Sequence, residues 1–385
     1  MNQRKSIKVT LTLLLLHTLS YFATPSSTLL SGSKNKNHRW NNQEEIVASE
    51  FKLSPEQIET FKRDGVLVIR GLLKGKELKN AIRTAKKMKR LSLLERIFNT
   101  LLTTSYRNID FQTWRKYKSM EHIAFDSNVP SIVAQLMGYV KYDNSETNNE
   151  NKSCSSSEKA IRLLNDAFLV YEDGGVGCGW HVDDKTFWPC TDSPIDTLDS
   201  GINVWITLSP IKASEGGGLA VAPTSHNAKW REEARGFIAG VDEVTNRVLT
   251  CEMERLSPDY HDKFEELKLT MDMEPGDAII HDRYIFHRSD AFKKERKIGW
   301  LKRKKLRISL RYMPSDANVD TRMGMEPAFL AKNMTTGDEI MKGEEYFPQV
   351  WPTSLRKERL KKADRPKSFL TWSFLIKIVK ARMKK

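Results

Sequence analysis

Cysteine is scarce in this chain, and no two cysteines have the spacing of a zinc motif. The four cysteines are Cys154, Cys178, Cys190 and Cys251, and the absence of a Cys-x-x-Cys pair argues against a structural zinc site. We expect Cys178 or Cys190 to be a buried thiol or part of one disulfide. The sequence also lacks a visible internal repeat, which excludes repeat architectures such as solenoids.

Long apolar runs are absent too, and this decides how the N-terminus is interpreted. Residues 1–42 begin with basic residues, continue with an apolar run from about Val9 to Leu19, and then become small and polar. The run is shorter than the roughly 20 residues that a membrane span needs, so the pattern predicts a cleaved signal peptide and the secretory pathway. The alternatives are a signal-plus-transit presequence for a plastid and a buried N-terminal helix.

Acidic residues are missing from the first 42 positions and rare in two other segments. Residues 1–42 carry a charge of +6, residues 293–307 carry +8 and residues 353–385 carry +10, so the rest of the chain carries −10 although the whole carries +14. A net acidic body argues against a nucleic-acid-binding surface. We therefore expect no nucleic-acid partner, and we expect the basic ends to serve targeting or contact with anionic lipid.

The C-terminal tail, residues 353–385, combines about ten apolar residues with a final Lys/Arg cluster. It is too short to span a bilayer. One hypothesis is an amphipathic helix that makes peripheral membrane contact, and the alternative is a helix packed back on the domain.

Between these ends, the pattern predicts one domain over residues 45–350 with an α-helical first part. A helix is expected after Ser54, with Pro55 at its first position, Gln57 completing a capping box and Gly65 at its end. Residues 141–159 are polar and low in complexity, as in a surface loop. Residues 227–265 have helical periodicity and predict an insertion beside the mouth of the domain.

The second part of the domain is mainly β in character. Short apolar or alternating runs separated by Gly, Pro, Asp and Ser are typical of an antiparallel sandwich or barrel. The runs cover residues 160–172, 202–211, 217–223, 267–273, 277–287 and 306–313. The fold class expected from the pattern is therefore mainly β with α.

A candidate metal site begins in the stretch GWHVDDKTFW, residues 179–188. His181 and Asp183 are two residues apart, so on an extended backbone both side chains point to the same side. One imidazole and one carboxylate on a common face can begin a divalent-metal site, and two histidines with one carboxylate is the arrangement of non-haem Fe(II). The neighbouring Asp184 is expected to be solvated rather than a further ligand.

The second histidine has four candidates, which are His226, His261, His281 and His287. In the stretch MEPGDAIIHDRYIFHRSD, His281 lies in the middle of an expected strand, whereas His287 lies where that strand would end at a barrel opening. His261 lies in a charged, helix-like stretch. The expected geometry therefore favours His287.

A row of cations follows in the stretch KLRISLRYM. Strict alternation places Lys305, Arg307, Ser309 and Arg311 on one face of a strand. The row is either a solvated cationic face or a site where one cation pairs with the distal carboxylate of a bound dicarboxylic acid, with Ser309 hydrogen-bonding beside it.

The order of these blocks resembles the phytanoyl-CoA dioxygenase family of Fe(II)/2-oxoglutarate oxygenases. The blocks are LSPEQIETFKRDGVLVIRGLL, WHVDD, VWITLSPIKASEGGGLAVAPTSH, PGDAIIHDRYIFHRSD and RISLRYMP, within residues 53–314. The resemblance implies a double-stranded β-helix, also called a jelly roll, and His181, Asp183 and His287 as iron ligands. It also implies that Fe(II), 2-oxoglutarate and O2 hydroxylate an unactivated C–H bond with release of succinate and CO2.

The chain departs from the family where the 2-oxoglutarate arginine is expected. A basic insertion lengthens the gap after His287, and the position that corresponds to the family's arginine holds Lys305. Arg307 begins an Arg-x-Ser pair of the kind that other 2-oxoglutarate oxygenases use, so we favour Arg307 and keep Lys305 as the alternative. Trp205, Asn165 and Tyr171 are candidate pocket residues, although core packing is the favoured interpretation for each.

Two other functions remain open from the sequence. One is a non-catalytic jelly-roll binding protein, and the other is a cupin-like metalloenzyme that uses no 2-oxoglutarate. For an enzyme, we expect a small-molecule substrate that is lipid-like or anionic, because the basic residues 293–305 and the 227–265 insertion would overhang the mouth. The sequence does not define the substrate or the oligomeric state.

Overall fold

In a computed structural model, the chain divides into two units, Met1–Val47 and Ala48–Lys385. The structure describes residues 51–88, 109–140, 159–172, 178–183, 201–227, 241–242, 247–248, 253–293, 303–319, 337–344 and 346–355. Three segments lie outside these residues: the predicted presequence, most of the polar loop at 141–159 and nearly all of the basic tail. What the sequence predicts for them stays a prediction. Within the described part, no helix is long and apolar enough to cross a bilayer.

The first described helix begins and ends where the sequence predicts. Helix α2 (Pro55–Asp64) carries the expected capping box, because Ser54 Oγ accepts from the Gln57 amide and Gln57 accepts from the Ser54 amide. Gly65 ends the helix with φ at 68°, a left-handed conformation that favours glycine. The chain then enters strand β1 (Val66–Ile69), as expected.

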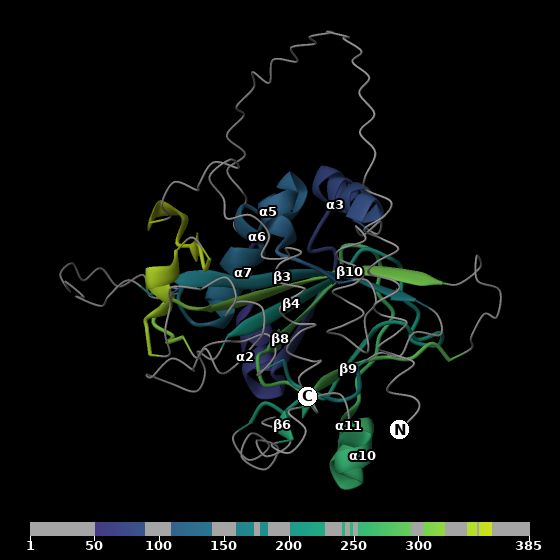
Figure 1. Ribbon diagram of the computed structural model, residues 1–385. Coiled ribbons are helices and arrows are strands. Elements are labelled where there is room, and N and C mark those ends of the chain that lie inside the picture. Colours follow the sequence, from purple (N-terminus) through teal and green to yellow (C-terminus); the bar gives the residue numbers. More distant parts are fainter. Residues whose placement is uncertain are drawn as a thin grey trace, which may run out of the picture. The chain divides into compact units, whose positions relative to one another are not determined.

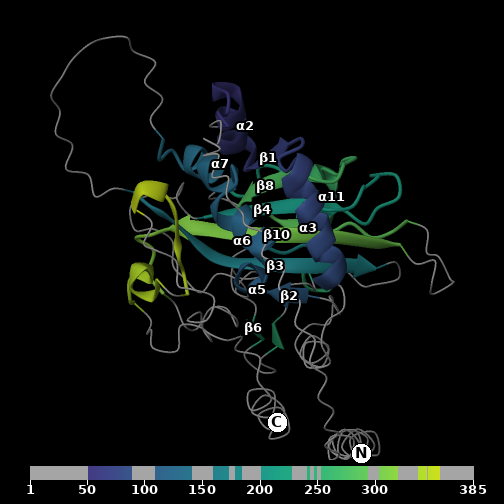
Figure 2. The same cartoon turned by 90° about the horizontal axis from the view of Figure 1, so that it is seen from above.

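Helices cover one face of the main sheet. Figure 1 shows α3, α5, α6 and α7 on one side of the strands, and Figure 2, seen from above, shows α3 and α6 over the strands and α2 beside the β1 edge. The bounds are α3 (Gly75–Met88), α5 (Thr113–Lys116), α6 (Lys118–Phe125) and α7 (Val129–Leu136). Their apolar side chains share one core with Phe168, Val204 and Ile308 of the sheet, so this face is sealed from water.

The main sheet is antiparallel, with seven strands. Its strand order is β1-β8-β4-β10-β3-β11, and β2 pairs with β3 beside this path. The bounds are β2 (Ile109–Phe111), β3 (Ile161–Glu172), β4 (Ile202–Thr207), β8 (Ala278–Asp282), β10 (Lys304–Pro314) and β11 (Gln349–Trp351). The predicted strands at 160–172, 202–211 and 306–313 are confirmed.

A smaller sheet packs against the uncovered face. Strand β5 (Leu219–Val221) pairs with β9 (His287–Ser289), and a backbone bridge adds His181 next to His287. Leu219 and Val221 pack against Trp205 and Ile279 of the main sheet. Two facing antiparallel sheets with helices outside confirm the predicted mainly β fold, and the region between the two sheets holds the candidate site.

The predicted run at 277–287 is two strands rather than one. Residues 283–286 turn the chain from β8 in the main sheet to β9 in the smaller sheet, so His287 begins a strand instead of ending one. The run at 267–273 is also different, because only Leu269 and Met273 make isolated bridges there. Both differences arise where the chain crosses between sheets, and residue alternation does not reveal such a crossing.

The remaining described elements lie in the insertion and near the C-terminal end of the domain. They are β6 (Val241–Asp242), β7 (Arg247–Val248), α10 (Met253–Leu256), α11 (Pro258–Leu267), η2 (Ile340–Gly343) and η3 (Thr353–Leu355). Within the described part of the insertion, α10 and α11 confirm the predicted helical periodicity, whereas β6 and β7 are two short paired strands that it did not predict.

Asp166 is buried on the helix-covered face of the main sheet, away from the candidate site, and its burial can be tested separately. Its carboxylate accepts from the Thr113 hydroxyl and the Trp114 amide, and burial raises its pKa from 3.8 to about 6. Its contribution to stability is therefore present below pH 3.8 and lost as the pH rises through about 6. We expect the free energy of unfolding of Asp166→Asn, measured with urea, to rise by about 3 kcal/mol relative to that of the wild type as the pH is raised from 4 to 7. A difference that does not change with pH would contradict this assignment.

Candidate metal site

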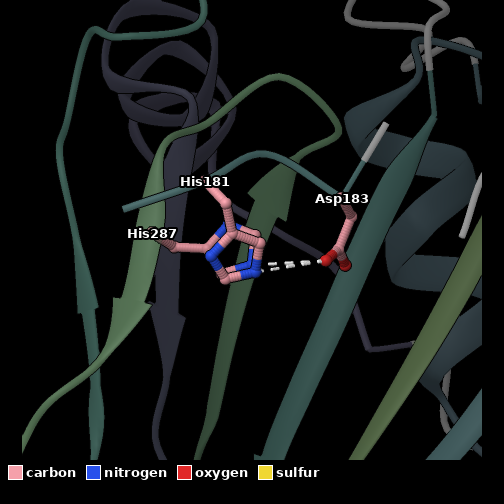
Figure 3. Close-up of side chains that lie close together, drawn as sticks. All are labelled: His181, Asp183 and His287. Atoms are coloured by element: carbon pink, nitrogen blue, oxygen red, sulfur yellow. Dashed lines mark ion pairs between the residues drawn. The ribbon is translucent and has the colours of Figure 1, made fainter. Parts of the chain in front are cut away.

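Two neighbouring residues, His181 and Asp183, and the distant His287 point their side chains to one place between the sheets. The Nε2 atoms of His181 and His287 each lie 3.6 Å from Asp183 Oδ1, and Figure 3 shows both rings turned toward this carboxylate. The three ligand atoms lie within 4.8 Å of one another. The structure thus brings together the three residues that the sequence predicts as metal ligands.

Both imidazoles are fixed with a lone pair toward the site. His181 Nδ1 lies 2.7 Å from the carbonyl oxygen of Gly179, and His287 Nδ1 lies 3.0 Å from that of Ile285. A carbonyl oxygen can only accept, so each Nδ1 carries the proton and each Nε2 carries a lone pair. Burial and the nearby His287 lower the pKa of His181, which favours the neutral ligand form. Two neutral imidazoles and one carboxylate fit a non-haem Fe(II) ion.

His181, Asp183 and His287 line one cavity between the sheets. Of the other histidines considered as ligands, only His281 also lines it. His281 is buried at its wall with its ring centroid 4.7 Å from that of His287, but it is not one of the three clustered ligands. Burial and the nearby His287 lower its pKa to about 3. His226 contacts the carbonyl of Lys62, and His261 lies on α11 beside Asp262. The choice of His287 is therefore consistent with the geometry.

The second oxygen of Asp183 is held by residues of the main sheet. Arg311 donates to Oδ2 from Nε at 2.9 Å and from Nη2 at 2.7 Å, and Asn203 Nδ2 donates to the same atom at 2.9 Å. These three donors leave Oδ1 toward the histidines. Register explains the arrangement, because Asn203 of β4 lies directly opposite Arg311 of β10.

The charge of Arg311 keeps Asp183 ionised in spite of its burial. Burial alone would raise the pKa of Asp183, but the nearby charge of Arg311 outweighs burial and holds this pKa well below its usual range. The side chains of Asp183 and Arg311 are 3% and 6% exposed, so water screens this pair very little. The site therefore presents an anionic oxygen to a metal.

Loss of the Arg311–Asp183 ion pair is expected to reduce folding stability strongly. We expect Arg311→Met to lower the free energy of unfolding of the metal-free protein by about 3–5 kcal/mol, because it leaves a buried carboxylate without its cation. Adding Asp183→Asn should recover part of the loss, since the uncompensated charge is then gone. Urea unfolding of both single variants and the double variant measures the coupling. Strictly additive losses would contradict the role given to the pair.

The cationic row on β10 is buried, so its interpretation as a solvated face is wrong. Arg307, Ser309 and Arg311 are 1%, 3% and 5% exposed and line the same cavity as the two histidines. Leu306, Ile308 and Leu310 point to the opposite face and join the helical core, as the alternation predicts.

The three cations of the row have different surroundings. Lys305 Nζ donates to the carbonyl oxygen of Pro210 at 2.6 Å, while Arg311 is paired with Asp183. Arg307 lies on the cavity wall, where Nη2 donates to Ser289 Oγ at 3.3 Å and Nη1 to the Gly218 carbonyl at 3.4 Å. Lys305 is not among the residues that line the cavity, so the geometry favours Arg307 over Lys305 as the residue that meets a ligand.

Aromatic rings hold the Arg307 guanidinium in place. Its central carbon lies 5.0 Å from the ring centroid of Tyr171 and 5.7 Å from that of Trp205. Trp205 also lines the cavity, as does Ser309, whose hydroxyl donates to Asn203 Oδ1 at 2.7 Å. Asn165 is buried on β3. Asp184 lies outside the described residues, so its solvated state stays a prediction.

A family comparison matches most of the domain. The model of the family described as phytanoyl-CoA dioxygenase matches residues 61–296. A search of curated proteins finds no match for the chain.

Two solved structures resemble the chain at low sequence identity. The non-haem α-ketoglutarate-dependent carbocyclase SnoK from nogalamycin biosynthesis is 17% identical, with a TM-score of 0.50, over 77% of this chain and 96% of its own. EctD from S. alaskensis, with 2-oxoglutarate and 5-hydroxyectoine, is 14% identical, with a TM-score of 0.46, over 80% and 89% of the two chains. At such identities the likeness to SnoK shows the fold alone.

Proposed function

The chain belongs to the phytanoyl-CoA dioxygenase family, and we propose that it is an Fe(II)- and 2-oxoglutarate-dependent dioxygenase that hydroxylates an unactivated C–H bond of a small or lipid-like molecule. The observation that carries the proposal is the convergence of His181, Asp183 and His287 on one point of a cavity that also holds Arg307. This donor set leaves coordination positions open for a cosubstrate and O2.

The protein's part in this reaction is to hold the metal and exclude water. His181 and His287 would each offer Nε2 to the metal and Asp183 would offer Oδ1, while Arg311 and Asn203 hold the other carboxylate oxygen. When bound, iron supplies the chemistry that uses O2 and 2-oxoglutarate to oxidise a C–H bond, with succinate and CO2 as co-products.

Arg307 is proposed to bind the distal carboxylate of 2-oxoglutarate. Its planar guanidinium can form two parallel charge-assisted hydrogen bonds to a carboxylate, and Tyr171 and Trp205 already fix its plane. Ser309 lies on the same face of β10 and could accept or donate beside it. Lys305 stays the alternative, although its ammonium group is directed to Pro210.

One part of the cavity wall is apolar and fits a hydrocarbon part of a substrate. This apolar part lies in the main sheet itself, next to β10 and not across the cavity from it, because Ala167 and Leu169 of β3 pair with Ser309 and Arg307 of β10. Ile109 and Phe111 of β2, which pairs with β3, complete it. An apolar wall beside the metal ligands keeps water from the reacting C–H bond. This supports a substrate that presents an aliphatic or otherwise apolar group to the metal.

Turnover of the cosubstrate tests the proposed function. Protein reconstituted anaerobically with Fe(II) and 2-oxoglutarate should show a weak metal-to-ligand absorption band, and O2 with a substrate panel should then give succinate and a product that is one oxygen atom heavier. Well-folded protein without the band would contradict the proposal. A band with no succinate from any panel member would favour a binding protein of the same fold.

We also propose that the protein acts in the secretory pathway, with plastid import as the alternative. Cys178 is disulfide-bonded, which agrees with an oxidising compartment. A fluorescent fusion to residues 1–42 that stays in the cytosol would contradict both routes.

A further inference from the structure

The two histidines of the site are joined by their backbones. The His181 amide donates to the His287 carbonyl at 3.0 Å, and the His287 amide donates to the His181 carbonyl at 2.9 Å. His287 lies in β9, whereas the His181 segment meets β9 through this isolated bridge and one further backbone hydrogen bond, from the Ser289 amide to the Cys178 carbonyl at 3.1 Å. The spacing of the two imidazoles therefore depends on what holds the His181 segment against β9.

Helix α11 of the insertion contacts the residues next to both histidines. Glu265 Oε1 accepts from Trp180 Nε1 at 2.9 Å and from Arg288 Nε at 2.7 Å, and Oε2 accepts from Arg288 Nη2 at 3.2 Å. Trp180 precedes His181 in the chain and Arg288 follows His287. One carboxylate thus joins the two segments that carry the histidines, and Figure 1 shows α11 close to β9.

An apolar layer beneath Glu265 reinforces this contact. Phe264, which is fully buried, stacks on Phe286 with ring centroids 4.2 Å apart and lies 5.8 Å from the ring of Trp180. Phe286 precedes His287 in the chain. The helix therefore touches both histidine segments through neighbouring residues, with a polar contact and an apolar one.

The polar contact is charged at physiological pH. Partial burial would raise the pKa of Glu265, but hydrogen bonds from Arg288 and Lys268 outweigh it and lower the pKa to about 2. Arg288 also lies over the Trp180 ring, with its guanidinium carbon 5.3 Å from the ring centroid. Both partners of Glu265 are thereby ordered against each other.

We propose that Glu265 is a positioning residue for the metal site, which fastens the His181 segment to β9 and so fixes the distance between the two imidazoles. Glu265 does not touch the metal, and it acts through Trp180 and Arg288. The proposal assigns a role to the insertion helix, and it rests on the proposed function only where metal binding is concerned.

The first test needs no metal. Residue-resolved hydrogen exchange of the metal-free protein should show the His181 and His287 amides exchanging at least about tenfold faster in Glu265→Ala than in the wild type. Amides of β4 and β10 should keep their rates. Asp262→Ala is the matched control, because Asp262 is an exposed acid on the same helix whose contact is with His261. Unchanged rates at His181 and His287 would overturn the proposal.

The second test measures metal affinity. Glu265→Ala should bind Fe(II) about tenfold more weakly than the wild type, as for other residues that orient a ligand, while Asp262→Ala binds equally well. Glu265→Gln should recover most of the affinity, because its amide oxygen can still accept from Trp180 and Arg288. Equal Fe(II) affinity in folded Glu265→Ala would overturn the positioning role.

A further variant guards against failure of Glu265→Ala to fold. Trp180→Phe keeps an aromatic side chain but removes the indole N–H that donates to Glu265, together with part of the bicyclic ring, so it should give a change in the same direction in both tests. No change in either test would overturn the proposal. If the wild type binds no Fe(II), the proposed function fails, but the exchange rates still decide whether Glu265 fastens the two segments.

Discussion

His287→Ala and Asp183→Asn are each expected to weaken Fe(II) binding by on the order of 100-fold or more. Loss of a residue that merely orients a ligand costs about 10- to 100-fold, and loss of the ligand itself should cost at least as much. His287 supplies one of two imidazole donors and Asp183 the single carboxylate oxygen of the cluster. Competition with a chromophoric chelator under anaerobic conditions measures the affinities.

Two matched variants control for burial and residue type. His226→Ala removes a histidine that contacts Lys62, and Asp166→Asn neutralises a buried carboxylate on the helical face of β3. Both should keep the Fe(II) affinity of the wild type. Wild-type affinity in His287→Ala or Asp183→Asn would contradict the assignment of the ligands.

Arg307→Met is expected to raise the dissociation constant for 2-oxoglutarate by at least about 100-fold, with little change in Fe(II) affinity. Two charge-assisted hydrogen bonds to the distal carboxylate would be lost, each contributing about 1.5–3 kcal/mol. Lys305→Met should change the constant only a few-fold, because Lys305 contacts the Pro210 carbonyl. Titration of the absorption band with 2-oxoglutarate gives both constants.

The comparison of these two variants decides between the residues that the sequence left open. A large loss in Lys305→Met with a small loss in Arg307→Met would contradict the assignment and restore the position that corresponds to the family's arginine. Methionine suits both sites because it keeps an unbranched, flexible side chain and carries no charge.

Residue alternation predicted which face of β10 carries the cations, but not whether that face meets water. A row of Lys and Arg is usually solvated, and only the second sheet, packed over Arg307 and Ser309, buries it. The pairing of β5 with β9 that forms this cover links residues about 70 positions apart. The residue pattern of one strand does not indicate which distant strand will pack over it.

His287 was predicted correctly as a clustered residue, although its local structure differs from the prediction. The turn at 283–286 carries no Gly or Pro, so the alternation suggested one strand from β8 through His287. The family resemblance supplied what the periodicity could not, because the blocks occur in the right order.

The sequence pattern did not indicate the residues that hold the ligands in place. Arg311 was one of several cations on its strand, and its partnership with Asp183 spans 128 positions. Glu265 was one acid among many in a charged helix, and its contacts with Trp180 and Arg288 depend on how the insertion docks. A local pattern cannot reveal such contacts, because they are set by tertiary packing.

A crystal structure of the anaerobic complex with Fe(II) and 2-oxoglutarate tests the central claim most directly. The account predicts one metal ion bonded to Nε2 of His181 and His287 and to Oδ1 of Asp183, with the distal carboxylate of 2-oxoglutarate on Arg307. A metal bound elsewhere, or a 2-oxoglutarate whose distal carboxylate meets Lys305 instead, would contradict it.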